Sequence, residues 1–243
     1  MAVWYALLDG TQEDFVHLKG LFPTSNFAFE EIDGKFALSA PVFSRSNDRD
    51  SALDAMSELI AAINTSLRLS VRSYSGVDLN GAVERREDGT VISRVIFAGG
   101  VASDDSFGAA AVSIAGSIGR PARSKEERLV SLLGRVPEIA GVAREMTTRP
   151  LTWSAMNIVY ESAKRLASTK TTPKARSNDH RCLVDRGWIS EGQSNSFYYT
   201  AKHWRHGFPR EPVEAGVVEM QYDDATVLIG GLFWRLVNHL EPE

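Results

Sequence analysis

The chain has 243 residues, a formal net charge of -4 and a sequence pI of about 5.8, with 43% hydrophobic and 24% charged residues. This composition is ordinary for a folded protein with a sizeable core, and its acidic balance excludes a protein that coats duplex nucleic acid by charge alone. A single cysteine excludes an intrachain disulfide, no apolar run approaches the ~20 residues of a membrane span, and the N-terminal sequence has no secretion pattern. We therefore expect a cytoplasmic protein that has no membrane segment.

The first hundred residues alternate short strand patterns with two helix patterns, which is typical of an α+β fold. A capping pattern at Thr11 predicts the start of the first helix. The dipeptides Asp33-Gly34 and Asp88-Gly89 each separate two alternating runs, so each predicts a tight hairpin turn. The predicted order is β-α-β-β-α-β-β, which gives a small, mostly antiparallel sheet with two helices on one face.

The composition shifts to Gly, Ala and Ser between residues 98 and 123, which indicates a loop or weak edge strand and then a linker. We place a domain boundary near residue 120, with an α+β domain over 1–120 and an all-α helical domain over 121–243. Ser124 followed by Glu127 predicts a capping box at the start of the helical domain. The apolar spacing then predicts five helices, over 124–134, 137–147, 152–168, 190–206 and 223–240. A loop is expected over 207–221.

A basic window between Lys164 and Arg210 holds ten basic residues and only three acidic ones. The same window contains six aromatic residues, three of the five histidines and the only cysteine. Because the flanking regions are acidic, this pattern favours a confined anionic ligand over a long one. If the chain has a binding or catalytic site, we expect it in this window.

The helix predicted over 190–206 has two contrasting faces. Phe197, Ala201 and Trp204 recur at helical spacing and are expected in the core. The opposite face gathers polar and basic side chains near the helix end, namely Asn195, Tyr199, Lys202, His203, Arg205 and His206. An imidazole transfers protons near neutral pH and a guanidinium stabilises negative charge, so such a set suits metal-free RNA cleavage. We expect His206 as the general base, Arg205 to stabilise charge, and His203 or Tyr199 to assist.

The alternative interpretation of this helix end is structural, because cations in the last turn complement the helix dipole and solvate the terminus. For phosphate binding, five side chains are the candidates, namely Lys170, Lys174, Arg176, Arg181 and Lys202. Three of them, Lys170, Lys174 and Arg176, lie within an exposed basic loop predicted over 164–178. The aromatic residues Trp188, Phe197 and Trp204 fit core positions better than a base-stacking platform.

His180, Cys182, His203 and His206 are the candidate ligands for a metal, but their spacing matches no recognised zinc pattern. Cys182 is more typical of a small buried residue than of a nucleophile. The sequence contains no G-x-x-x-x-G-K-[ST], G-x-G-x-x-G after a strand, G-x-S-x-G or H-E-x-x-H motif. We therefore expect neither a metal nor a cofactor.

The segment FYYTAKHWRHG, with the Pro-rich gap and hydrophobic terminal helix that follow it, resembles the ends of bacterial proteins with a HEPN-like helical domain. The resemblance covers roughly residues 153–240. It implies a helical bundle, often dimeric, whose relatives cleave RNA without metal in toxin and phage-defence systems. The family motif R-x4-6-H is absent here, because His206 follows Arg205 directly.

Two functional hypotheses follow. The first is a bacterial RNA-binding protein or nuclease, acting in defence or toxin-type RNA processing, with RNA and a second copy of the chain as partners. The second is a non-enzymatic protein-interaction or anion-binding module, in which the basic window only recognises an anion or an acidic partner. Whether the Arg205-His206 pair faces a cleft or open solvent distinguishes the two, since a general base must reach the proton it removes.

Overall fold

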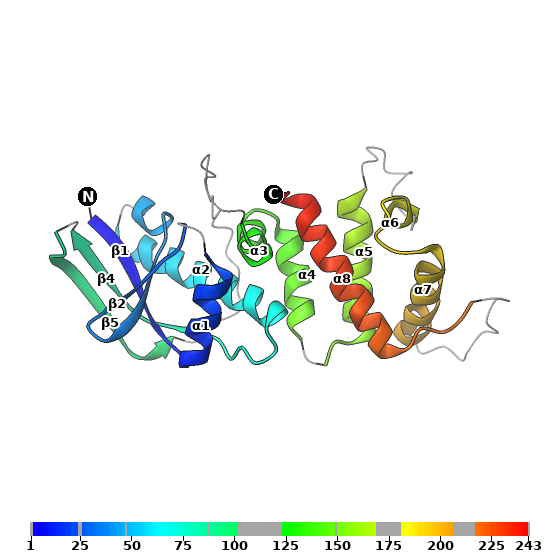
Figure 1. Ribbon diagram of the computed structural model, residues 1–243, viewed down its shortest axis with the longest axis horizontal. Helices are drawn as coiled ribbons and strands as arrows, with labels where there is room; N and C mark the ends of the chain where they lie inside the picture. Colours follow the sequence, from blue (N-terminus) through cyan, green and yellow to red (C-terminus); the bar gives the residue numbers. More distant parts are fainter. Residues whose placement is uncertain are drawn as a thin grey trace. The chain divides into compact units, whose positions relative to one another are not determined.

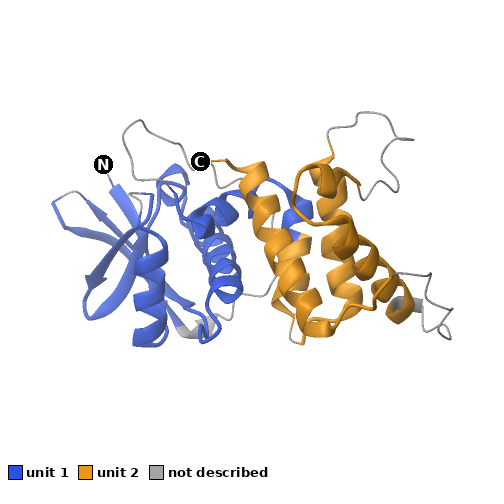
Figure 2. Ribbon diagram, turned by 45° about the vertical axis from the view of Figure 1, so that its right-hand side comes forward, with its two compact units in different colours: residues 1–140, 243 blue, residues 141–242 orange. Residues whose placement is uncertain are grey.

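The computed structural model describes residues 2–23, 26–46, 48–86, 88–101, 123–148, 150–168, 181–206 and 217–242. The chain divides into two compact units, residues 1–140 and residues 141–242 (Figure 2). Among the described residues, no helix is long and apolar enough to span a membrane. The architecture confirms the α+β class, because a five-stranded antiparallel sheet is followed by helices.

The first unit follows the predicted order β-α-β-β-α-β-β (Figure 1). Its sheet elements are β1 (Ala2–Asp9), β2 (Ala28–Ile32), β3 (Lys35–Ser39), β4 (Asp78–Arg86) and β5 (Val91–Val101), and its helices are α1 (Gln12–Leu21), η1 (Phe43–Arg45), α2 (Arg49–Ser70) and α3 (Lys125–Leu133). The spatial order of the strands is β2-β3-β1-β4-β5. Both predicted hairpins form, since Asp33, Gly34 and Gly89 adopt the positive φ angles that such turns need.

One face of the sheet is covered by helices, as Figure 1 shows for α1 and α2. The ring of Phe15 on α1 stacks on that of Phe36 on β3, with centroids 4.2 Å apart. Phe36 pairs with Leu8 of β1, and alternation along β1 therefore places Trp4 and Ala6 on the same face. All three β1 side chains are buried, so this face forms the main core of the unit.

The sheet is strongly curled, so that its opposite face is concave. A flat sheet would hold β2 and β5 about 19 Å apart, because neighbouring strands lie about 4.8 Å apart. Nevertheless Arg94 of β5 donates to Asp33 at the end of β2 over 2.8 Å, and Arg85 of β4 lies 3.6 Å from Glu30 of β2. The concave side encloses a second small core, formed by Leu7, Ile32, Ala37 and Val83. The Arg94–Asp33 pair therefore bridges the sheet from one margin to the other, and the Arg85–Glu30 pair bridges it from β4 to β2, both on the side of this apolar core.

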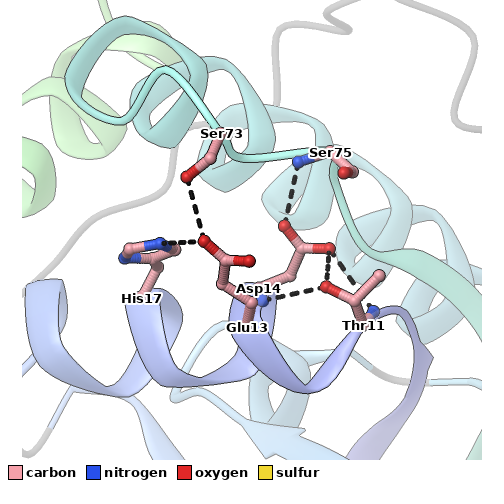
Figure 3. A network of polar contacts seen from close by, with 6 residues as sticks. All are labelled: Thr11, Glu13, Asp14, His17, Ser73 and Ser75. Carbon is pink, nitrogen blue, oxygen red and sulfur yellow. Dashed lines mark hydrogen bonds and ion pairs between the residues drawn. The ribbon is translucent and has the colours of Figure 1, made fainter.

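Helix α1 is tied to the segment that follows α2, as Figure 3 shows. Thr11 and Asp14 form the predicted capping box, and the second carboxylate oxygen of Asp14 accepts the backbone N–H of Ser75 over 2.9 Å. Burial by itself would raise the pKa of Asp14, but the hydrogen bonds from Thr11 and Ser75 outweigh burial and lower that pKa. The Ser73 hydroxyl also donates to Glu13, whose carboxylate lies 3.6 Å from His17.

Helix α3 belongs to the first unit, whereas the predicted boundary near residue 120 assigned it to the helical domain. Ser124 caps α3 as predicted, and its hydroxyl also donates to the carbonyl of Leu21 at the end of α1. The hydroxyls of Ser66 and Ser70 on α2 donate to Glu126. These contacts connect α3 to α1 and α2, which explains why the unit extends beyond the predicted boundary. Residues 102–122 of the loop and linker expected over 98–123 fall outside the described residues, and the start of that segment forms the end of β5.

The second unit is helical, and no strand occurs among its described residues. Helix α4 (Pro137–Thr147) runs across the division, and the unit continues with α5 (Trp153–Ala167), α6 (Arg181–Asp185), α7 (Glu191–His206) and α8 (Tyr222–Leu240). All five predicted helices match to within one residue at each end, while the short α6 was not predicted. Helix α5 packs against α6, α7 and α8.

Candidate functional site on helix α7

Helix α7 carries most of the described residues that the sequence marked as functional. Its start is fixed by a reciprocal capping box, in which the side chain of Gln193 accepts from the Ser190 backbone and the Ser190 hydroxyl accepts from the Gln193 backbone. Its buried face packs on α5, where the hydroxyl of Tyr160 lies 2.7 Å from that of Ser194. Burial raises the pKa of Tyr160 to about 12, so this hydroxyl stays protonated and serves the packing of the two helices.

Helices α5 and α7 run antiparallel. Tyr160 meets Ser194 near the start of α7, while Trp153 at the start of α5 lies against Trp204 near the end of α7. The thiol of Cys182 on α6 donates to the backbone carbonyl of Lys164, near the end of α5. The first turn of α6 and the last turn of α7 therefore lie at opposite ends of α5.

Three of the predicted catalytic and binding side chains share one face of α7. Tyr199, Lys202 and His203 fall within one turn of each other along this face; Lys202 is exposed, and the other two are half-buried. The backbone of Arg205 and His206 completes the last turn of the helix, but the side chains of both residues lie outside the described part of the structure. The predicted set is thus brought together in part.

The predicted phosphate-binding residues are less compact. Lys170, Lys174 and Arg176, like His180, lie outside the described residues. Arg181 opens α6 and Lys202 lies near the end of α7, so these two occupy opposite ends of α5, and about 16 Å of helix separates Lys164 from Trp153. Arg181 and Lys202 therefore do not form one patch.

The start of the basic window is not the exposed loop that was predicted. Lys164 and Arg165 belong to the last turn of α5, and Lys164 is only 8% exposed. Its ammonium lies 2.8 Å from the carboxylate of Glu161 and 5.3 Å from the ring centre of Tyr160. An opposite charge and an aromatic face thus offset the burial of this cation. Lys164 is not available to bind a phosphate.

Trp204 differs most from the prediction, because it is 57% exposed instead of buried. The apolar stripe of α7 is otherwise as expected, since Phe197 and Ala201 are fully buried. Trp204 lies where the stripe reaches the first turn of α5, and its ring runs parallel to that of Trp153, at 5° and with centroids 6.5 Å apart. The edge of Tyr222 contacts Trp153 from α8, and the Tyr222 hydroxyl donates to the carbonyl of Leu151 over 2.6 Å. The result is an anchored aromatic surface that presents Trp204 to solvent.

A groove of about 730 Å³ lies beside the first half of α7. Its walls come from α7, from the segment 217–221 and from the first turns of α8. This groove was not predicted from the sequence, although Val227 is a signal for it, because Val227 is a large apolar residue on the polar face of α8. The remainder of the loop expected over 207–221, residues 207–216, lies outside the described residues.

Metal-binding geometry is absent from the described part of the chain, where no three His, Cys, Asp or Glu side chains converge. Cys182 is half-buried and its thiol contacts a backbone carbonyl. Of the other three candidate ligands, only the side chain of His203 is described, and its ring meets that of Trp204 edge-on at 6.3 Å.

Comparisons of the chain with protein-family models, with curated proteins and with solved structures give no match. The HEPN-like resemblance therefore stays a prediction. The side chains of α7 and their surroundings are the features that bear on function, because a fold by itself does not define an activity.

Proposed function

We propose that the second unit binds single-stranded RNA at the end of helix α7. The observation that carries this proposal is the exposed ring of Trp204, which is held parallel to Trp153. A base that stacks on an exposed aromatic ring contributes about 1–3 kcal/mol to the free energy of binding, and this contribution depends little on which base it is. An exposed tryptophan supported from behind by a second indole is suited to that contact.

The charges around Trp204 support an RNA ligand. Lys202 is exposed near the same end of α7, on a different face of the helix from Trp204, and the basic window adds further cations on both sides of α7 in the sequence. Single strands are favoured over duplexes, because stacking requires bases that are not already paired and stacked. Because the net charge of the chain is -4, the chain as a whole does not attract RNA, and the proposed contact is confined to a local basic surface.

The test is fluorescence anisotropy of the intact protein with a labelled single-stranded RNA of mixed sequence and with the same strand annealed to its complement. We expect Trp204→Ala to weaken single-strand binding about tenfold or more, as loss of one stacked base implies, and Trp204→Phe to retain most of it. Tyr198→Ala is the matched control, because Tyr198 is an exposed aromatic residue elsewhere on α7. Equal effects of the two alanine variants, or stronger binding of the duplex, would refute the proposal.

Charge is tested separately by salt titration. Lys202→Gln should reduce the slope of log affinity against log salt by about 0.7, the value for one phosphate contact in a single strand. Arg72→Gln removes one exposed positive charge from the first unit and should leave the slope unchanged. An unchanged slope in Lys202→Gln would remove this lysine from the binding surface.

Cleavage at the same surface is a second proposal, which rests on the shared face of Tyr199 and His203. In this reaction His203 or His206 accepts the proton of the ribose 2′-hydroxyl, the 2′-oxygen bonds to phosphorus, and the bond from phosphorus to the 5′-oxygen breaks. The second histidine or Tyr199 donates a proton to the leaving 5′-oxygen, and Arg205 stabilises the charge on phosphorus. No metal takes part in these steps.

Cleavage is tested by incubating the protein with single-stranded RNA in EDTA. His203→Ala and His206→Ala should each slow cleavage about 100-fold or more, as loss of a general acid or base implies, while His17→Ala in the first unit should not. Intact RNA after incubation with the wild-type protein removes the cleavage proposal and leaves the binding proposal standing.

The proposal keeps two further expectations from the sequence. A second copy of the chain is the other partner implied by the HEPN-like resemblance, and sedimentation velocity over a range of concentrations would detect it. The cytoplasmic location expected from the sequence is the other, and microscopy of a tagged protein would test it.

A further inference from the structure

We propose that the groove between α7 and α8 is a docking site for a basic, amphipathic peptide segment of another protein. The inference is independent of RNA binding, because the groove lies along the first half of α7 and the aromatic surface lies at its end. It rests on how the groove is built, on the side chains that line it and on its charge.

The floor of the groove is held in place by hydrogen bonds to α7. The hydroxyl of Ser196 donates to the carbonyl of Val218, and the hydroxyl of Thr200 accepts the backbone N–H of Met220 over 2.9 Å. Thr200 is fully buried and also donates to the carbonyl of Ser196, so its hydroxyl both accepts and donates a hydrogen bond. The segment from 217 to 221 therefore has a defined position beside the helix, and the groove is formed before any partner arrives.

Five of the twelve residues that line the groove are apolar, and two of them are the most exposed large apolar side chains in the described part of the chain. Val218 and Val227 are 75% and 76% exposed, one on the connecting segment and one on α8. Val217, Met220 and Leu228 line the same hollow. Exposed apolar groups gathered in a concave site indicate an interaction surface, because burying them against a partner removes them from water.

The charge at the groove has one sign among the described lining residues. The exposed carboxylate of Asp224 lines it, and no lysine or arginine is among the described lining residues. The exposed carboxylates of Asp223 and Glu191 adjoin lining residues on α8 and α7. This arrangement is complementary to a lysine or arginine side chain and repels a nucleic acid, which distinguishes the groove from the basic end of α7.

The shape favours a peptide over a small molecule. Pockets for small ligands bury about 70–90% of the ligand surface. Here two of the principal apolar contacts are themselves three-quarters exposed, so the groove is open along its length. An open groove that combines exposed apolar side chains with acidic ones matches the mode in which an amphipathic segment inserts its apolar side chains and pairs its charges at the rim.

The experiment is selection of a random peptide library displayed on phage against the immobilised intact protein. Enriched peptides are then synthesised with a fluorophore, and their affinities are measured by anisotropy. We expect the enriched sequences to combine apolar residues with lysine or arginine. Val227→Asp should weaken their binding about tenfold or more, the effect of losing one anchor at an interface, and Asp224→Asn should weaken it less and reduce its salt dependence.

Two matched controls separate the groove from general surface effects. Val16→Asp places the same charge at an exposed valine of α1, and Asp50→Asn removes an exposed carboxylate from the first turn of α2, as Asp224→Asn does from α8. Both should bind the selected peptides as the wild type does. The proposal is overturned if no peptide is enriched, if the enriched peptides are acidic, or if Val16→Asp weakens binding as much as Val227→Asp.

Discussion

The hydroxyl oxygens of Tyr160 and Ser194 lie 2.7 Å apart between α5 and α7, and both side chains are buried. Removing one partner leaves the other hydroxyl in an apolar interior, which costs about 1–3 kcal/mol. Tyr160→Phe should therefore lower the free energy of unfolding by this amount in urea denaturation. The double variant Tyr160→Phe/Ser194→Ala should lose less than the sum of the single losses, and strictly additive losses would show that the hydrogen bond does not stabilise the helix pair.

Asn64 on α2 is expected to be among the most sensitive polar residues of the first unit. Its amide donates to the carbonyl of Val77 over 2.8 Å and accepts from the N–H of Val77 and from the hydroxyl of Tyr74. Asn64→Ala should cost about 3 kcal/mol or more, because several buried groups lose their partner together. Asn80→Ala is the control, since Asn80 accepts only a part-buried bond from Lys35, and a comparable loss there would contradict the argument.

Asp14 should make the stability of the first unit depend on pH in the acid range. Its pKa is lowered in the folded state, so the carboxylate contributes stability above its ordinary pKa of 3.8. That contribution is lost as the pH falls below 3.8 and through the lowered pKa. The difference in unfolding free energy between wild type and Asp14→Asn should therefore be constant near neutral pH and shrink in acid. A difference that stays constant down to pH values below 3.8 would disagree with the lowered pKa.

Trp204 and Phe197 should differ sharply in their effect on stability, although both lie on the apolar stripe of α7. Phe197 is fully buried, and Phe197→Ala should cost about 3–5 kcal/mol. Trp204→Ala should cost much less, about 1 kcal/mol, because it removes mainly the contact with Trp153. Thermal melts of the two variants test this difference, and equal decreases in melting temperature would show that Trp204 is part of the core.

The features that could be predicted from the sequence are those decided over a few residues. The turn at Asp33-Gly34 needs positive φ angles, and the cap at Thr11 needs an acceptor three residues before a backbone donor. The helices of the second unit follow from an apolar period that is legible in any window of two or three turns. Such local requirements explain why the strand order along the chain and the helix bounds were predicted correctly.

The features that could not be predicted depend on where a neighbouring element begins or ends. Trp204 lies on the buried stripe of α7, but it reaches the first turn of α5, a relationship between residues about fifty positions apart. The sequence places Lys164 in a basic run that is typical of an exposed loop. Its burial is possible because Glu161 and the ring of Tyr160 lie beside its ammonium group. The groove is formed by two helices and a connecting segment, so no single stretch of sequence marks all of it.

The ion pairs that span the curled sheet change how the first unit can open. In most sheets the outermost strands separate first, each independently of the other. Here the turn after β2 carries Asp33, and β5 at the far margin carries Arg94, so fraying of either strand breaks the same contact. We therefore expect fraying at the two margins to be coupled through this contact, so that salt, which screens the ion pair, speeds the exchange of amide hydrogens in β2 and β5 together.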